Sequence, residues 1–463
     1  MQQLTLTLEH RSGSPMYEQL YRYFVEEIHT GRRKAGEKLP SKRSLCQHLN
    51  ISQSTVETAY GLLLSEGYIS SRPKSGYYVA EFETLSPSAS YLPPKEDPGA
   101  ATPAVAARFD FSTAAVDTSL FPYSSWARLN KEIVYSSPEL LQQGERQGEP
   151  VLRDALCAFL EEYRGVNCTP EQIVVGAGME YLTGLLLQLL PKDTVYGMED
   201  PGYGSIEHTI LNEGRALRYI PLDSEGMSVR ALEESDVNVA YLTPSHQFPM
   251  GITMPAGRRS RLLRWANQHP GRYIIEDDYD SDFRHTSRPL PAMQGMDGHG
   301  KVIYIGTFSR SLAPSIRIAY LVLPGELLER YRVLFSHSRS TVSRYEQAVM
   351  ARFLSEGFYA RYLRRVGRLY TQRRNRLVAA LERIEGVSLS GSGGGLHFLL
   401  TNERFSEEDL CRRAQSVGIK LRGLSSYCRL GTAKASTVVL GYGGLKDEGI
   451  AEAANVLKQA WTP

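Results

Sequence analysis

Two apolar runs separated by a polar turn are the feature that most constrains the fold of this chain. Residues 302–305 and 318–323 each have the length and composition of a buried strand. The turn between them carries hydroxyl and guanidinium groups, on Thr307, Ser309, Arg310, Ser311 and Arg317. Arginine offers a fixed fork of donors that matches phosphate oxygens. The stretch therefore predicts two buried strands joined by a turn that can bind an anion.

The surrounding sequence favours an α/β domain over residues 108–463. The 463 residues are enough for two or three domains. From residue 108 on, strand-like runs alternate with helical runs, which predicts a mainly parallel sheet. We expect large-subdomain strands at 171–175, 237–242 and 272–275, helices at 325–332 and 344–385, and a smaller α/β subdomain with strands near 396–400, 418–421 and 437–440.

Two further segments place polar groups at the ends of predicted strands. Gly176-Ala177-Gly178 stands before a helix, where a phosphate can meet free backbone N–H groups, although a simple tight turn gives the same pattern. The acidic segment 276–284 follows the strand at 272–275. Buried acids need partners, and ligands bind at this edge of open α/β sheets, but a solvated loop is the alternative interpretation.

The first 80 residues have a different pattern and a positive charge. They hold 10 Lys/Arg and 7 Asp/Glu, a net charge of +3, while the remainder holds 53 − 10 = 43 basic and 51 − 7 = 44 acidic residues. Ser14-Pro15 and Ser41 are typical of helix starts, and a third helix follows Ser52. A hairpin with Pro and Gly in its turn closes the segment at 68–79. Residues 10–80 therefore predict a winged helix-turn-helix domain.

Residues 81–107 are dominated by Pro, Ser and Ala and lack a persistent apolar period. This composition predicts a flexible linker, with a loop packed on the large domain as the alternative.

The N-terminal domain resembles the GntR-type DNA-binding domain. The matching segments are LPSKRSL (39–45), SQSTVETAY (52–60) and EGYI (66–69). The resemblance implies that double-stranded operator DNA meets the first turn of the third helix, where short polar side chains face phosphates or base edges. Arg43 is the expected guanine reader and Lys74 stands at the hairpin tip. The expected DNA-binding residues are Arg43, Ser52, Gln53, Ser54, Thr55 and Lys74. A helical cap with ordinary surface charges is the alternative.

The large domain resembles the fold-type I, pyridoxal-phosphate-dependent aminotransferases. The segments MEDPGYGS (198–205), TPSHQFPMG (243–251), EDDYDSDFR (276–284) and IGTFSRSLAPSIRIAYLVLP (305–324) carry the resemblance. It implies that Tyr203 stacks on the cofactor ring, Asp277 pairs with the ring nitrogen and Tyr279 contacts the ring's 3-oxygen. The remaining cofactor-binding residues are expected to be Gly176, Ala177, Gly178, Thr307, Ser309, Arg310 and Arg317. For the effector carboxylate the candidate is Arg429, with Arg422 and Lys434 as competitors.

The combination resembles the MocR subfamily of the GntR family. This resemblance implies a homodimer with swapped domains, an amino acid or amine effector, and pyridoxal 5'-phosphate as a ligand, bound non-covalently or as an external aldimine. In the fold-type I aminotransferases a lysine forms the imine with the cofactor, and here the position holds Arg310. Arginine stays protonated and its lone pairs are delocalised, so we expect no catalytic residue at this position. Either the chain is a regulator that binds an anion without a covalent bond, or the arginine is an introduced lysine replacement.

Two other functions remain open at this point. One is an aminotransferase that carries a DNA-binding module, and the other is a repressor whose large domain serves only for dimerisation. The five cysteines are scattered without a CxxC pair, which favours reduced thiols and no metal site. The start of the sequence lacks the features of a signal peptide, and no apolar run is long enough for a membrane span. We therefore expect a cytoplasmic protein.

Overall fold

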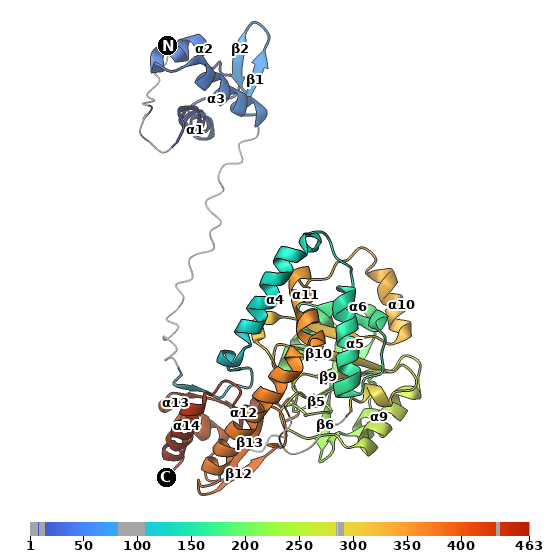
Figure 1. Ribbon diagram of the computed structural model, residues 1–463. Coiled ribbons are helices and arrows are strands. Elements are labelled where there is room, and N and C mark those ends of the chain that lie inside the picture. Colours follow the sequence, from blue (N-terminus) through green and yellow to red (C-terminus); the bar gives the residue numbers. More distant parts are fainter. Residues whose placement is uncertain are drawn as a thin grey trace. The chain divides into compact units, whose positions relative to one another are not determined.

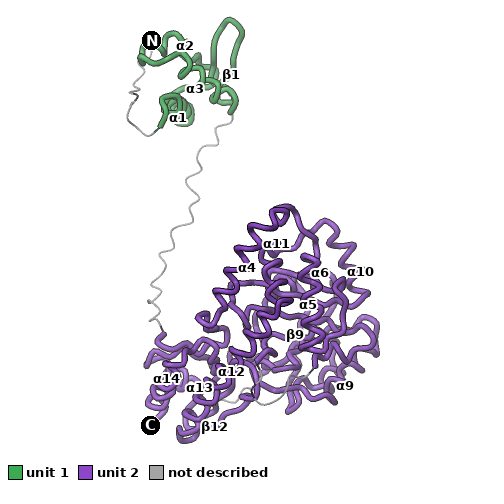
Figure 2. Tube along the Cα trace, in the orientation of Figure 1, with its two compact units in different colours: residues 1–103 green, residues 104–463 purple. Residues whose placement is uncertain are grey.

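A computed structural model describes residues 8, 14–81, 107–283, 285, 291–431 and 436–462. The chain divides into two compact units, residues 1–103 and 104–463 (Figure 2). Most of the predicted linker, residues 82–106, lies outside the described residues. Among the described residues, the structure contains no helix that is long and apolar enough to cross a membrane.

The first unit has three helices and a hairpin, as the sequence predicts (Figure 1). Its elements are α1 (Met16–His29), α2 (Lys42–Leu49), α3 (Gln53–Ser65), β1 (Ile69–Arg72) and β2 (Gly76–Val79). The side chains of Ser41 and Ser52 accept hydrogen bonds from the backbone N–H groups of Ser44 and Thr55, and so cap α2 and α3. Val56, Ala59, Tyr60 and Leu63 of α3 are buried and pack with apolar residues of α1 and the hairpin.

The second unit is built on a mixed eight-stranded sheet. The strands are β4 (Ile173–Gly176), β5 (Val195–Asp200), β6 (Ala216–Asp223), β7 (Gly226–Met227), β8 (Val239–Leu242), β9 (Tyr273–Asp278), β10 (Val302–Thr307) and β11 (Ala319–Val322). Their order is β4-β11-β10-β9-β8-β5-β6-β7. Neighbours from β6 to β10 are parallel, whereas β11 is antiparallel to both β10 and β4, and β7 is antiparallel to β6.

Both faces of this sheet are covered by helices (Figure 1). Alternate residues of a strand point to opposite faces. In β10, Ile303 and Ile305 pack with α6 (Met179–Leu189), α7 (Gly204–Asn212) and α10 (Gly325–Leu334). Val302 and Tyr304 face the other layer. That layer contains α4 (Tyr123–Ser136), α5 (Pro150–Arg164), α8 (Val229–Glu233), α9 (Ala256–Asn267) and α11 (Arg344–Ser355). Such double cover buries the strands on both sides and leaves their ends for function.

A smaller four-stranded sheet follows, in the order β12-β13-β16-β15. Its strands are β12 (Val387–Ser390), β13 (His397–Asn402), β15 (Arg422–Gly423) and β16 (Thr437–Gly441). The helices α12 (Phe358–Leu381), α13 (Glu407–Ser416) and α14 (Asp447–Ala460) accompany it. A separate two-residue pair joins β3 (Phe109–Asp110) to β14 (Ile419–Lys420).

The structure corrects three predicted elements. The helix predicted at 344–385 is interrupted at Gly357, whose φ of 71° favours glycine and ends one helix before the next. The strand predicted at 171–175 begins two residues later, because Pro170–Gln172 forms a 3₁₀ turn. Of the strand predicted at 418–421, only Ile419–Lys420 is a strand, and it pairs with β3. The next two residues in a strand, Arg422–Gly423, pair with β16 instead.

Candidate functional site

A cavity of about 200 Å³ lies at the edge of the large sheet where the parallel strands end. It brings together seven of the residues that the sequence nominates for the cofactor: Tyr203, Asp277, Tyr279, Thr307, Ser309, Arg310 and Arg317. Gly176, Ala177 and Gly178 join β4 to α6, whose first residues, Met179 and Glu180, also line the cavity. The nominated residues therefore converge from four separate parts of the sequence.

One end of the cavity has donors for an anion. Gly178 precedes α6 with a φ of 97°, and a Cβ there would lie 2.1 Å from Arg317 Nη2. Arg317 pairs with Glu180 at 2.6 Å. The backbone N–H of Ser309 donates to Thr307 Oγ1 at 3.1 Å, and Ser309 Oγ has no partner within the described part of the chain. A free hydroxyl, a guanidinium and a helix N-terminus are suited to a phosphate group.

Asp277 also lines the cavity, as a buried carboxyl group with one free oxygen. The Tyr241 hydroxyl donates to Asp277 Oδ2 at 2.5 Å, whereas Oδ1 has no partner among the described residues. Burial raises the pKa of Asp277 to about 8, against the hydrogen bond from Tyr241, and the neighbouring Asp278 raises it further. A buried carboxyl with a free oxygen is suited to a protonated ring nitrogen.

The next acid on β9, Asp278, has a full set of partners. Arg164 donates to it with Nε at 2.7 Å and with Nη2 at 3.2 Å. The Tyr304 hydroxyl donates to the same carboxylate. Glu276, one residue earlier, accepts the backbone N–H groups of Met293 and Gln294. Glu276, Asp277 and Asp278 of the acidic segment are therefore part of a buried strand and not of the solvated loop that the sequence left open.

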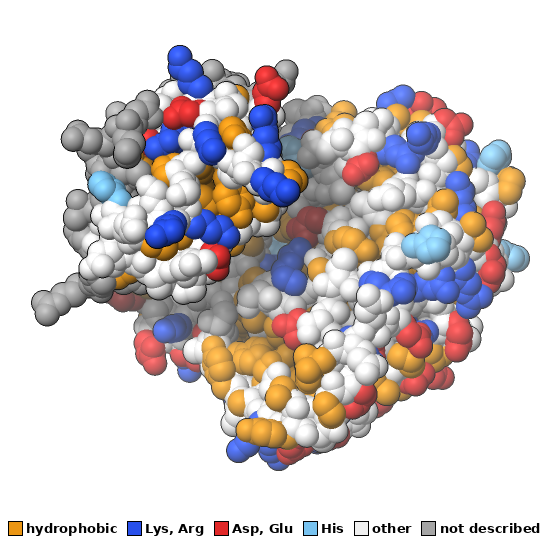
Figure 3. All heavy atoms as spheres, turned by 90° about the horizontal axis from the view of Figure 1, so that it is seen from above, with side chains coloured by type: hydrophobic (Ala, Val, Ile, Leu, Met, Phe, Trp, Pro, Cys, Tyr) orange, Lys and Arg blue, Asp and Glu red, His pale blue; other side chains and the backbone are white. Residues whose placement is uncertain are grey.

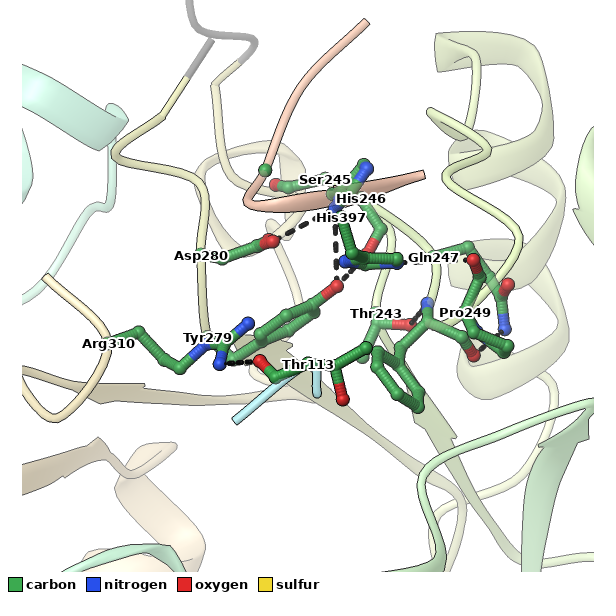
Figure 4. A network of polar contacts seen from close by, with 12 residues as sticks. Thr113, Thr243, Ser245, His246, Gln247, Pro249, Tyr279, Asp280, Arg310 and His397 are labelled. Carbon is green, nitrogen blue, oxygen red and sulfur yellow. Dashed lines mark hydrogen bonds and ion pairs between the residues drawn. The ribbon is translucent and has the colours of Figure 1, made fainter. Parts of the chain in front are cut away.

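Tyr279 connects the cavity to a buried cluster of His246, Asp280 and His397 (Figure 4). The Tyr279 hydroxyl donates to the backbone oxygen of His246 at 3.0 Å and lies 3.2 Å from its Nδ1. His246 Nδ1 is also 3.0 Å from Asp280 Oδ2. His397 belongs to β13, so the cluster joins the large and small sheets. Burial holds the pKa of His397 at about 3, which keeps this ring neutral.

Arg310 enters the same cavity, and its Nη1 donates to the backbone oxygen of Thr113 (Figure 4). The two described candidates for an effector carboxylate, Arg429 and Arg422, are not among the residues that line the cavity. The guanidinium of Arg429 pairs with Glu207 through bonds of 2.9 and 2.8 Å. Arg422 is exposed on β15, and Lys434 lies outside the described residues.

Several cavity residues have no assignment from the sequence: Thr113, Ala114, Met179, Glu180, Thr243, Phe248 and Pro314. Thr243 and Phe248 belong to the motif TPSHQFPMG. This motif indicated that the segment is part of the site, but it did not indicate the roles of these two residues. Thr113 reaches the cavity because the chain after β3 is fixed to the small sheet, where Gly441 N–H donates to Phe111 O at 2.8 Å. Nothing in the local sequence around Thr113 indicates this placement.

The nominated DNA-binding residues lie on the first unit at α2, α3 and the hairpin tip. Arg43, Ser52, Gln53, Ser54 and Lys74 are exposed, and Thr55 is half-buried. Ser52 is occupied in capping α3, and Gln53 donates to Glu57 at 3.1 Å. Lys and Arg side chains gather on the face of this unit that is seen in Figure 3. That face can approach a polyanion.

The cavity fits a ring that carries a nitrogen at one end and a phosphate at the other. The free oxygen of Asp277 can meet the nitrogen and the free hydroxyl of Ser309 can meet the phosphate, and Arg317 fills the space that a side chain at residue 178 would take. Pyridoxal 5'-phosphate has this distribution of groups, so the residues present fit the cofactor that the fold implies.

The comparisons with known proteins agree with this two-part organisation. Residues 16–79 match the family described as bacterial regulatory proteins, gntR family, and residues 110–428 match aminotransferase class I and II. The chain is 38% identical to the HTH-type transcriptional regulator YdeL of Bacillus subtilis, over 96% of this chain and 97% of that protein. It is 34% identical to the "Probable rhizopine catabolism regulatory protein MocR" of Rhizobium meliloti, over 98% and 96% of the two chains. It is 31% identical to the pyridoxine biosynthesis transcriptional regulator PdxR of Corynebacterium glutamicum, over 88% and 87%.

Solved structures resemble the second unit. A multiple substrate aminotransferase from Thermococcus profundus has a TM-score of 0.69 at 25% identity and covers 77% of this chain and 91% of its own. A kynurenine aminotransferase from Pyrococcus horikoshii has a TM-score of 0.68 at 25% identity, with 76% and 90% covered. The chain therefore belongs to the MocR-type, GntR-family transcriptional regulators, in which a winged helix is joined to an aminotransferase-like domain of fold type I.

Proposed function

We propose that this protein binds operator DNA through its winged helix and senses pyridoxal 5'-phosphate, alone or with an amino compound, in the cavity of its second unit. The observation that carries the proposal is a cofactor-shaped cavity with a free Asp277 oxygen but an arginine at residue 310. No lysine is among the residues that line this cavity. The name of one relative, PdxR, refers to the regulation of pyridoxine biosynthesis.

When bound, the cofactor supplies an electron-withdrawing ring and an aldehyde. The residues of this chain have complementary roles: Asp277 binds the ring nitrogen, Ser309 and Arg317 bind the phosphate, and Tyr203 contacts the ring. Arg310 cannot supply the neutral amine that would bond to the aldehyde. The proposed output is therefore a change in DNA binding and not amino-group transfer.

The proposal includes a homodimer whose two winged helices address two half-sites, as the family resemblance implies. Large apolar side chains that are exposed on the second unit support a second copy there, among them Tyr135 at 81% and Leu141 at 80% exposure. Sedimentation that gives a monomer at all concentrations would contradict this part.

The first experiment selects a DNA duplex from a random pool with the full-length protein and measures its affinity by fluorescence anisotropy. Arg43→Ala is expected to weaken binding by about 10-fold or more, because a bidentate contact to guanine is lost. Arg22→Ala is the matched control, since it removes an exposed arginine of α1 that pairs with Glu18. Unchanged sequence-specific binding in Arg43→Ala would remove the role assigned to that residue.

The second half of the experiment adds pyridoxal 5'-phosphate. We expect a change in DNA affinity and a rise in melting temperature, because a ligand that binds the folded state stabilises it. Absence of both changes would favour a repressor whose large domain serves only for dimerisation. Amino-group transfer by this chain would overturn the non-enzymatic assignment and favour an aminotransferase that carries a DNA-binding module.

A further inference from the structure

Arg310 differs from the other arginines near the cavity because it has no acidic partner within the described part of the chain. Arg317, which lines the cavity, pairs with Glu180, and Arg429, which does not, pairs with Glu207. The contact that Arg310 makes with Nη1 is to a neutral carbonyl, that of Thr113, and its Nε has no partner among the described residues. A guanidinium keeps its charge and offers five donors, so this cation still has donors for a ligand.

The charge of Arg310 acts on two tyrosines that line the cavity, Tyr203 and Tyr279. Figure 4 shows its side chain directed toward Tyr279 and Thr113. Burial raises the pKa of the Tyr203 hydroxyl, and the positive charge of Arg310 opposes that rise. Burial also raises the pKa of Tyr279, and Arg310 again opposes the rise. A pyridoxal ring that contacts Asp277 through its nitrogen and Ser309 and Arg317 through its phosphate would therefore have the positive charge of Arg310 beside one edge.

Two buried acids lie near this position, and each already has a partner at one of its oxygens. Burial keeps Asp277 protonated up to a pKa of about 8, and its free oxygen is assigned to the ring nitrogen. Asp280 contacts His246 through Oδ2 at 3.0 Å, and its Oδ1 has no partner among the described residues. Burial raises the pKa of Asp280, but the charges of His246 and Arg310 lower it below the usual range, so the charge of this carboxylate is already shared between two cationic groups. A ligand that brings an ammonium group to Arg310 would place two like charges in a poorly hydrated space, whereas a carbonyl or carboxylate oxygen would accept its hydrogen bonds.

We propose that Arg310 makes the cavity select pyridoxal-type phosphates whose 4'-substituent carries an oxygen acceptor, an aldehyde or a carboxylate, over those that carry an ammonium. This selection rests on the proposed function and specifies its ligand. The preferred ligand is pyridoxal 5'-phosphate in its free aldehyde form, and pyridoxamine 5'-phosphate is disfavoured. Arg310 is thus a specificity-determining residue and requires no covalent step.

Calorimetric titration of the full-length protein with three ligands tests the proposal. The ligands are pyridoxal 5'-phosphate, pyridoxamine 5'-phosphate and 4'-deoxypyridoxine 5'-phosphate, which has only a methyl group at the 4'-position and therefore no heteroatom there. We expect affinity to fall in the order aldehyde, methyl, ammonium, with about 10-fold or more between the first and the last. In Arg310→Gln the aldehyde-to-ammonium ratio should fall to near one.

Arg317→Gln is the matched control because it removes a guanidinium from the phosphate end of the same cavity. It should weaken all three ligands by a similar factor and leave their order unchanged. Arg310→Met replaces Arg310→Gln if the latter has a lowered melting temperature. An aldehyde-to-ammonium ratio that is the same in Arg310→Gln and the native protein overturns the selection but leaves the proposed function intact. If no ligand binds any variant, the cofactor-sensing part of the proposed function fails as well.

Discussion

The two faces of strand β9 hold neighbouring acids in opposite conditions. On one face, Asp278 is bound by Arg164 and Tyr304, and its charge is balanced within the core. On the other face, Asp277 has one hydrogen bond from Tyr241 and a free oxygen that is directed to no group of the described chain. The two residues share a strand and a chemical type and differ only in their partners.

This difference separates stability from binding. A buried charge that is paired and hydrogen-bonded contributes to the fold or is neutral, but it becomes costly when its partner is removed. A buried polar group without a partner destabilises the protein until a ligand supplies one. Asp278 therefore belongs to the scaffold and Asp277 to the site, and the comparison can be tested by changing each side separately.

The largest effect is expected on the Asp278 face. Arg164→Ala leaves a buried carboxylate without its cation and should lower the free energy of unfolding by about 3–5 kcal/mol. Urea denaturation of the ligand-free protein measures this change. The double variant Arg164→Ala/Asp278→Ala should recover part of the loss, because no unpaired charge remains. A single variant as stable as the native protein would show that the pair is not structural.

Substitution of Asp277, on the other face, should instead raise the free energy of unfolding. The pKa of Asp277 is raised from 3.8 to about 8 by burial, so its folded form resists ionisation. The stability that comes from burying the neutral Asp277 carboxyl is fully present below pH 3.8 and is lost as the pH rises through about 8. Asp277→Asn does not ionise, so at pH 9 it should be more stable than the ligand-free native protein, by on the order of a few kcal/mol. Near pH 4 the two should be similar.

The same Asp277→Asn variant should lose pyridoxal 5'-phosphate affinity by about 10-fold or more, because the ring nitrogen loses the carboxyl group that is its partner. Thermal unfolding across the pH range and titration with the ligand measure the two effects. A variant that is less stable than the native protein at pH 9, or that binds the ligand equally well, would place Asp277 with Asp278 in the scaffold.

The smallest effect is expected at the phosphate end. Ser309→Ala removes a hydroxyl that has no partner in the described structure, so the melting temperature of the ligand-free protein should be unchanged. Affinity for the phosphate ligand should fall by up to about 10-fold, since one hydrogen bond to a charged group is lost. A lower melting temperature without a change in affinity would assign Ser309 to the fold.

The sequence allowed the two-unit organisation and most of the cavity to be predicted, because motifs at strand ends converge in an open sheet. The rule predicted that the acidic segment and the polar turn with Thr307 and Ser309 lie at this edge, whereas Asp277 was singled out by the family resemblance. The rule does not extend to Arg429. The sequence does not reveal that Arg429 pairs with Glu207, which lies more than two hundred positions away. Thr113 and Tyr241 were missed for the same reason, because their roles depend on contacts between distant segments.

The hydrogen bond from Arg310 to the Thr113 carbonyl has a mechanical consequence. Thr113 lies three residues after β3 (Phe109–Asp110). The linker, and before it the winged helix, precede β3 in the sequence. A guanidinium can hold a backbone carbonyl and ligand oxygens at the same time because its donors point in different directions. A displacement of the backbone at Thr113 and a change of charge in the cavity would therefore both act on the side chain of Arg310.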